Sequence, residues 1–162
     1  MPKKISVPPT VMALLISIVI FAFMISTPSI GIDELLSAPE QIEIDGRRYN
    51  LESFLWRDFM PISPPDGKNL IASVQITAAD KLEFPSSIYP DRLWVIKGRG
   101  EIWETPFTNE RPAPLHNYQL EIIARGGPKW GPNIQVDIVV KIIHGWNTYL
   151  LKASNQTIHA TY

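Results

Sequence analysis

The stretch NIQVDIVVKII, residues 133–143, decides the fold of this chain. On an extended backbone its apolar residues share one side: Ile134, Val136, Ile138, Val140 and Ile142. The other side carries Gln135, Asp137 and Lys141. Alternation with period two over this length predicts a β-strand with one face in a core and one polar face.

Similar alternation recurs on both sides of this stretch, between turn signals. Asp45-Gly46 and residues 97–100 predict tight hairpin turns, and HGWN at 144–147 predicts the turn after the central strand. Residues 52–62 are ambiguous, because their apolar residues also fit a helical spacing. Fourteen of the 15 prolines precede residue 130, so the last thirty residues predict an uninterrupted central hairpin. Residues 157–162 are predicted to extend the edge of the sheet.

The predicted fold class is all-β. Seven or eight short strands with regular turns are similar in pattern to a single immunoglobulin-like or fibronectin III-like antiparallel β-sandwich over residues 41–162. Trp94 falls where such domains carry a core tryptophan, whereas the cysteine pair of antibody domains is missing. The likeness is one of pattern, and a fold by itself implies no function.

The N-terminus predicts a membrane segment. Residues 1–9 form a basic leader with Lys3 and Lys4, and residues 10–27 form an apolar transmembrane signal anchor or a cleaved signal peptide. A buried core helix is the remaining alternative. Residues 28–40 are expected to form a linker with one helical turn. The positive leader favours a domain outside the cytoplasm, single-pass or secreted after cleavage.

Composition excludes several classes of function. The formal net charge is -1, so a nucleic-acid partner is not expected. Without cysteine, thiol catalysis and sulfur-based zinc sites are excluded. The histidines are scattered and have no carboxylate at a ligand spacing: His116, His144 and His159. No catalytic residue, metal site, nucleotide site or cofactor is predicted, and the chain is not expected to be an enzyme.

The stretch RGGPKWGPN, residues 125–133, is the most unusual loop. Its glycine spacing does not match a phosphate-binding loop, and a strand follows it instead of a helix. It is either a connecting turn or a binding loop in which Lys129 lies beside Trp130. Trp146, in the turn after the long strand, either folds back over its hairpin in a structural role or is a second candidate binding residue at the opposite end. Asn155 begins NQT and is a candidate glycosylation site.

These features predict a membrane-anchored binding module outside the cytoplasm, with a protein or a cell-surface polymer as its partner. A purely structural subunit of an envelope complex is the first alternative. A secreted hydrolase of polysaccharide or peptide is the second, and it would require two carboxylates, or a serine and a histidine, in one pocket.

Overall fold

The computed structural model describes residues 30–162. The predicted leader and the whole of the predicted membrane anchor, residues 10–27, therefore lie outside the described residues. Within the part that is described, no helix is long and apolar enough to cross a membrane.

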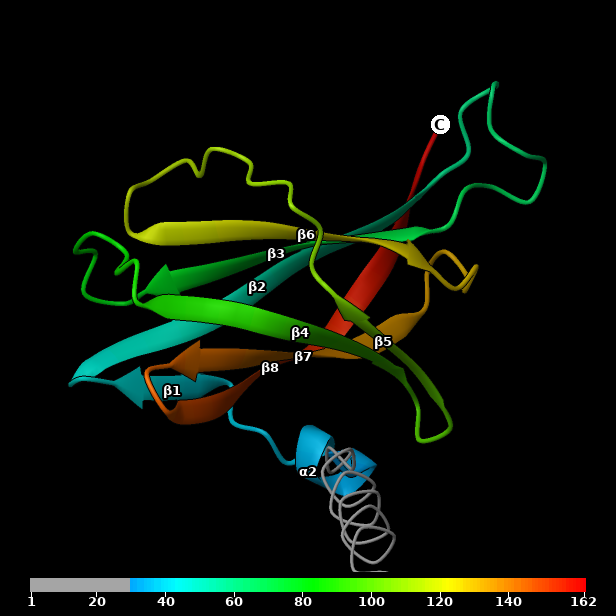
Figure 1. The fold of residues 1–162 in the computed structure, drawn as a ribbon. Coiled ribbons are helices and arrows are strands. Elements are labelled where there is room, and N and C mark those ends of the chain that lie inside the picture. Colours follow the sequence, from blue (N-terminus) through cyan, green and yellow to red (C-terminus); the bar gives the residue numbers. More distant parts are fainter. Residues whose placement is uncertain (1–29) are drawn as a thin grey trace, which may run out of the picture. The chain divides into compact units, whose positions relative to one another are not determined.

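Eight strands and one short helix make up the domain, which confirms the all-β prediction (Figure 1). In chain order they are α2 (Ile32–Leu36), β1 (Gln41–Ile44), β2 (Arg47–Asp58), β3 (Leu70–Ala78), β4 (Ile88–Lys97), β5 (Glu101–Pro106), β6 (Gln119–Gly127), β7 (Gln135–His144) and β8 (Asn147–Thr161).

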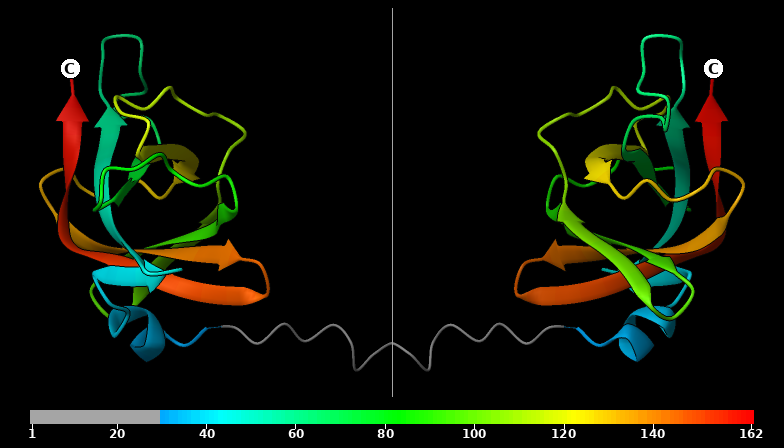
Figure 2. Two further views of the ribbon diagram at one scale, coloured as in Figure 1. Left: turned by 90° about the vertical axis from the view of Figure 1, so that its left-hand side faces the viewer. Right: turned by 90° about the vertical axis from the view of Figure 1, so that its right-hand side faces the viewer.

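The strands form one curled sheet in the order β5-β4-β7-β8-β2-β3-β6, with β1 paired to β2. We call the part with β1, β2, β3, β6 and the end of β8 sheet A. The part with β4, β5, β7 and the start of β8 is sheet B. The two parts lie one across the other (Figure 2). Since β2 and β8 are parallel, the sheet is mixed, whereas the prediction was purely antiparallel. The immunoglobulin-like assignment is not confirmed.

A single hydrophobic core lies between the inner faces of sheets A and B. The alternation of residues 133–143 is confirmed, since four of its apolar side chains are buried in this core: Val136, Ile138, Val140 and Ile142. From sheet A, Tyr49 and Leu55 contribute large buried side chains. Residues 52–58 continue β2, so the ambiguous segment begins as a strand.

Strand β8 joins the two sheets, and here the sequence-based prediction was wrong. Residues 157–161 lie in the middle of the sheet, where Ile158 pairs with Leu55 of β2. The strand changes partner around Asn155, whose φ of 55° accompanies a register shift between Val136 and Ile138 of β7. A bulge of this kind bends a strand and increases its twist, so one strand serves both sheets.

The curl brings the two edge strands, β5 and β6, into contact. Trp103 of β5 packs over the backbone of Gly127 in β6, where an added Cβ would lie 2.7 Å from the indole ring. Glycine is therefore required by close approach at this point. Side-chain packing, rather than a ladder of hydrogen bonds, closes this side of the domain.

Helix α2 covers part of the outer face of sheet B. Its Leu35 is buried, as is Ala38 just after it, and the Lys152 Nζ donates a 2.7 Å hydrogen bond to the carbonyl of Leu36. The outer face of sheet B also carries buried apolar side chains that lie outside the central core: Trp94, Ile96 and Val139. Trp94 is thus buried, but on the outer face of sheet B and not between the sheets.

Candidate functional site

The outer face of sheet A carries a row of aromatic side chains. Because Leu51 and Leu55 of β2 fill the core, the alternation of the strand directs Phe54 and Trp56 away from it. Half of the Phe54 side-chain surface is exposed, at 50%, and Trp56 is half-buried. The parallel pairing places His159 of β8 opposite Trp56.

These three rings stack on one another. The ring centroids of Phe54 and Trp56 are 5.4 Å apart with an interplanar angle of 30°. Those of Phe54 and His159 are 5.1 Å apart at 15°. Offset stacking at such distances holds aromatic rings in a fixed orientation. We call Phe54, Trp56 and His159 the aromatic row.

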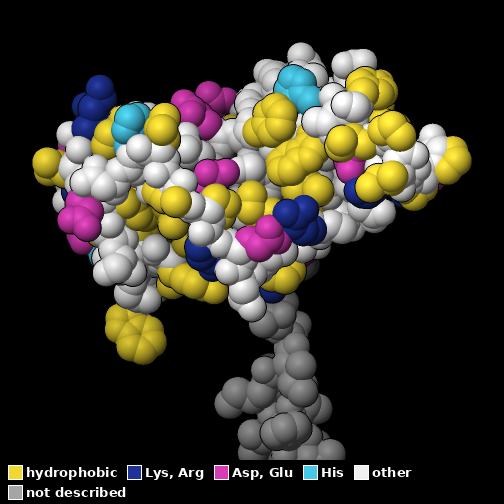
Figure 3. All heavy atoms as spheres, turned by 90° about the horizontal axis from the view of Figure 1, so that it is seen from above, with side chains coloured by type: hydrophobic (Ala, Val, Ile, Leu, Met, Phe, Trp, Pro, Cys, Tyr) yellow, Lys and Arg dark blue, Asp and Glu magenta, His cyan; other side chains and the backbone are white. Residues whose placement is uncertain are grey.

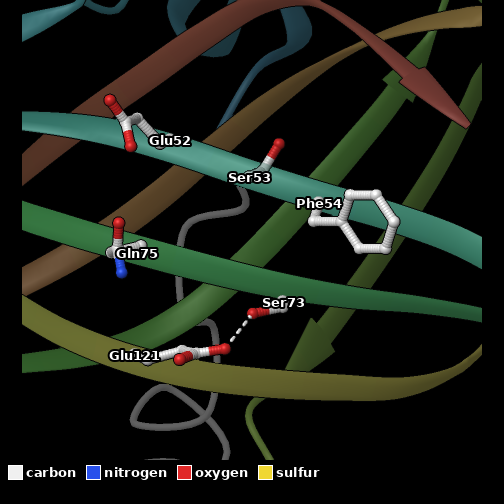
Figure 4. Close-up of a pocket in the computed structure, with 6 residues that line it drawn as sticks. All are labelled: Glu52, Ser53, Phe54, Ser73, Gln75 and Glu121. Atoms are coloured by element: carbon white, nitrogen blue, oxygen red, sulfur yellow. Dashed lines mark hydrogen bonds between the residues drawn. The ribbon is translucent and has the colours of Figure 1, made fainter. Parts of the chain in front are cut away.

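A polar hollow of about 230 Å³ lies beside the aromatic row, over β2, β3 and β6 (Figure 4). We call it the polar hollow; its lining is Glu52, Ser53, Phe54, Ser73, Gln75 and Glu121. Cross-strand register aligns Glu52 with Gln75 and Gln75 with Glu121. Two carboxylates and an amide therefore follow one another across the face.

Hydrogen bonds fix one side of the polar hollow. The Ser73 hydroxyl donates to Glu121 Oε1 at 2.6 Å, and Gln119 Nε2 donates to Gln75 Oε1 at 3.2 Å. Among the described residues, neither the Glu52 carboxylate nor the Gln75 amide nitrogen has a partner. The hollow thus offers one donor and several acceptors next to an aromatic ring, which suits a ligand with hydroxyl groups and an apolar ring face.

The surrounding surface carries charges of both signs. Figure 3 shows one side of the domain, on which hydrophobic groups lie among separate acidic and basic side chains. Several charged side chains of the described residues are paired, such as Arg125 with Glu110 beside sheet A and Arg92 with Glu104 in sheet B. This mixture agrees with the small net charge and gives a phosphate-rich polymer little to bind.

Sequence-predicted Lys129 and Trp130 lie in a loop that is held tightly. Lys129 Nζ is 2.6 Å from Asp66 Oδ2, and this hydrogen bond lowers the pKa of Asp66. Trp130 is half-buried against the core, and the Lys97 ammonium lies 5.7 Å from its ring centroid. Packing of this kind gives Trp130 a structural role; binding by these two residues stays a prediction.

Buried Arg57 anchors the loop RGGPKWGPN to the loop between β2 and β3. Its guanidinium donates to the carbonyls of Lys129 and Gly131 at 3.1 and 3.0 Å. It also donates to the carbonyls of Asp66 and Lys68, in the loop between β2 and β3. One guanidinium therefore satisfies backbone carbonyls of two loops. It holds the loop RGGPKWGPN against the loop between β2 and β3.

Trp146 and Asn155 are placed apart from the aromatic row. Trp146 is fully exposed in the turn between β7 and β8, at the opposite end of β7 from Trp130, so the two do not form one site. Asn155 is exposed at the bend of β8, and its backbone N–H donates to Asp137 Oδ1 at 2.9 Å. Glycosylation of Asn155 and binding by Trp146 stay predictions.

Residues 30–162 contain no group of three histidine, cysteine or acidic side chains that could hold a metal ion. His116 instead stacks on Tyr118, with centroids 4.8 Å apart, and His144 Nε2 lies 3.4 Å from Asp45 Oδ2.

The sequence alone does not predict the aromatic row. Trp56 belongs to residues 52–62, whose apolar spacing is ambiguous between strand and helix, and it lies on an outer face. The alternation of β2 contains a signal, because Phe54 and Trp56 share the side that carries Glu52. The third member, His159, joins only through the parallel pairing of β2 with β8, which has no local signal in the sequence.

Comparison of the chain with protein-family models, with curated proteins and with solved structures gave no match.

Proposed function

We propose that the chain is a membrane-anchored binding module outside the cytoplasm, and that it holds a cell-surface carbohydrate polymer on the outer face of sheet A. The observation that carries this proposal is the aromatic row, whose stacked rings lie on the outer face of sheet A beside the polar hollow. Exposed aromatic rings on a rigid scaffold are characteristic of binding surfaces.

The chemistry beside the aromatic row favours sugars. The faces of Phe54 and Trp56 attract the C–H groups of a sugar ring, because an aromatic ring is negative on its face. The Gln75 amide nitrogen and the Glu52 carboxylate have no partner among residues 30–162, so they offer a donor and an acceptor for ring hydroxyls. A protein partner would favour an interface centre depleted of charged residues, whereas Glu52 and Glu121 lie directly at this one.

Membrane attachment is supported by the sequence of the N-terminus. Lys3 and Lys4 precede the apolar run of residues 11–25, which favours a retained anchor with the domain outside the cytoplasm. A module held on the membrane in this way would fix a polymer close to the cell surface.

Binding of the full chain to insoluble cellulose, chitin and peptidoglycan tests the proposal. At least one polymer is expected to retain the protein. Trp56→Ala and Phe54→Ala should each weaken that binding about tenfold, which corresponds to about 1.4 kcal/mol. Ile62→Ala, at an exposed loop position, is the control and should bind like the wild type.

Retention by none of the three polymers would contradict the proposal, and so would binding that Trp56→Ala leaves unchanged. Lys129→Ala and Trp146→Ala examine the loops that the sequence favours. If these variants weaken binding and the aromatic-row variants do not, the polymer is held by the loops instead.

Hydrolysis of the bound polymer is a second candidate function. Glu52 and Glu121 line the same polar hollow from strands separated by β3, so their backbones lie about 10 Å apart. Inverting glycosidases carry two carboxyl groups about 6.5–9.5 Å apart. Binding is the main proposal because Glu52 is exposed on an open face, without shelter from water. Release of reducing ends that Glu121→Gln abolishes would establish hydrolysis.

A further inference from the structure

The outer face of sheet B is apolar well beyond the area under α2. Strand pairing aligns Tyr89 with Ile143 and Ile96 with Ile102, and paired residues point to the same face. Tyr89 is 56% exposed and Ile102 is 43% exposed. Fully exposed Trp146 follows Ile143 in the turn from β7 to β8. A tryptophan in this state has apolar surface that no part of the described domain covers.

The charges on this face are largely neutralised within the domain. Lys141 Nζ lies 2.9 Å from Asp91 Oδ2, and Arg92 is paired with Glu104 at 3.0 Å. Lys152 donates to the carbonyl of Leu36. An occupant of this face would therefore meet aromatic and aliphatic groups more than free charge.

The path of the chain points to one occupant. The predicted membrane segment ends at residue 27, and α2 begins at Ile32 on the outer face of sheet B. From the end of that segment to Ile32 there are five Cα–Cα steps, which span at most about 18 Å when fully extended. A bilayer crossed by that segment would therefore lie within this distance of the start of α2.

We propose that the outer face of sheet B rests on the membrane, with Trp146 and Tyr89 in the interface between lipid headgroups and acyl chains. Tryptophan and tyrosine are enriched at this level because their rings are apolar with one polar end. The inference rests on the membrane anchor of the proposed function. It would turn the outer face of sheet A, and the aromatic row, away from the membrane.

The absence of cysteine makes the test direct. Thr148→Cys, at an exposed position paired with Ile143, and Ile62→Cys, in the loop between β2 and β3, each accept a single fluorophore. The full chain is reconstituted in phosphatidylcholine vesicles that contain a phospholipid spin-labelled near its headgroup. Quenching is expected for the label at residue 148 and not for the label at residue 62. Adding Trp146→Ala to Thr148→Cys should lower the quenching toward that control.

The possible outcomes distinguish a failure of the membrane anchor from a failure of the docking of sheet B on the membrane. If alkaline carbonate extracts the protein from the vesicles, the anchor fails and the docking fails with it. If the protein is retained but both labels are quenched equally, the anchor stands and the docking is overturned. Quenching that disappears in 1 M salt, where the screening length is about 3 Å, would overturn the aromatic contact in favour of charge attraction.

Discussion

The two outer faces of the curled sheet contain the same kind of residue in opposite situations. Trp56 on sheet A and Trp94 on sheet B both point away from the core from strand positions. Trp56 is half-buried in an exposed aromatic row, whereas Trp94 is only 4% exposed on the outer face of sheet B. The difference teaches that an outward tryptophan stabilises the fold where the chain supplies a cover, and is available for binding where it does not.

Replacing these two tryptophans with alanine should give the largest contrast. Trp94→Ala leaves a cavity where a buried ring was and is expected to cost about 3–5 kcal/mol of unfolding free energy. Trp56→Ala removes a half-buried ring and should cost about 1 kcal/mol. Urea unfolding followed by far-UV circular dichroism measures both. Equal costs would show that the aromatic row is part of the stabilising framework and would remove the contrast between the faces.

Gly127→Ala tests whether the contact of β5 with β6 holds sheets A and B together. The new methyl group would meet the Trp103 ring, and overpacking of this kind costs about 1–3 kcal/mol. Gly100→Ala is a matched control, because an added Cβ there meets nothing within 4 Å. A melting temperature that falls equally for both variants would exclude a specific role for the contact of Trp103 with Gly127.

The smallest expected effect concerns the connection that leads from sheet A to sheet B, residues 79–87. Arg47 Nε lies 2.6 Å from Asp80 Oδ2, and this hydrogen bond lowers the pKa of Asp80 from 3.8 to about 2. Since the folded pKa lies below the unfolded one, the pair stabilises the domain fully above about pH 4. That contribution is lost as the pH falls toward 2.

Asp80→Asn should therefore reduce stability slightly at pH 7 and have almost no effect near pH 2. Unfolding curves of the wild type and the variant at both pH values measure this change. Glu104→Gln, which breaks the ion pair with Arg92 inside sheet B, serves as the control. A loss for Asp80→Asn that is the same at both pH values would assign the effect to something other than the carboxylate charge.

Local patterns predicted the strands and turns but not how the sheet closes. The alternation of residues 133–143 and the Asp45-Gly46 turn predict local geometry, and both are confirmed. The bend of β8 depends on a bulge at Asn155 opposite Asp137 of β7, and the closure depends on Trp103 meeting Gly127. Contacts between residues so far apart leave no periodic signal.

The candidate site residues also fall into those that the sequence predicts and those that only the fold brings together. Lys129, Trp130 and Trp146 stand out in the sequence because they lie in glycine-containing turns. Packing against the core restricts Trp130, which the composition of its loop does not reveal. The polar hollow required the register of three strands, since Glu52 and Glu121 are adjacent only through Gln75.

The course of β8 also bears on how the domain folds. The hydrogen bond between Ser53 and Gln156 joins residues 103 positions apart, and the neighbouring parallel pair of β2 with β8 closes a loop of similar length. Contacts of such sequence separation form slowly, because the entropy of loop closure opposes them. A chain interrupted before Ile158 would lack the strand segment that completes the core against Leu55. During synthesis, the domain must therefore wait for residues 156–161 before its two halves become one cooperative unit.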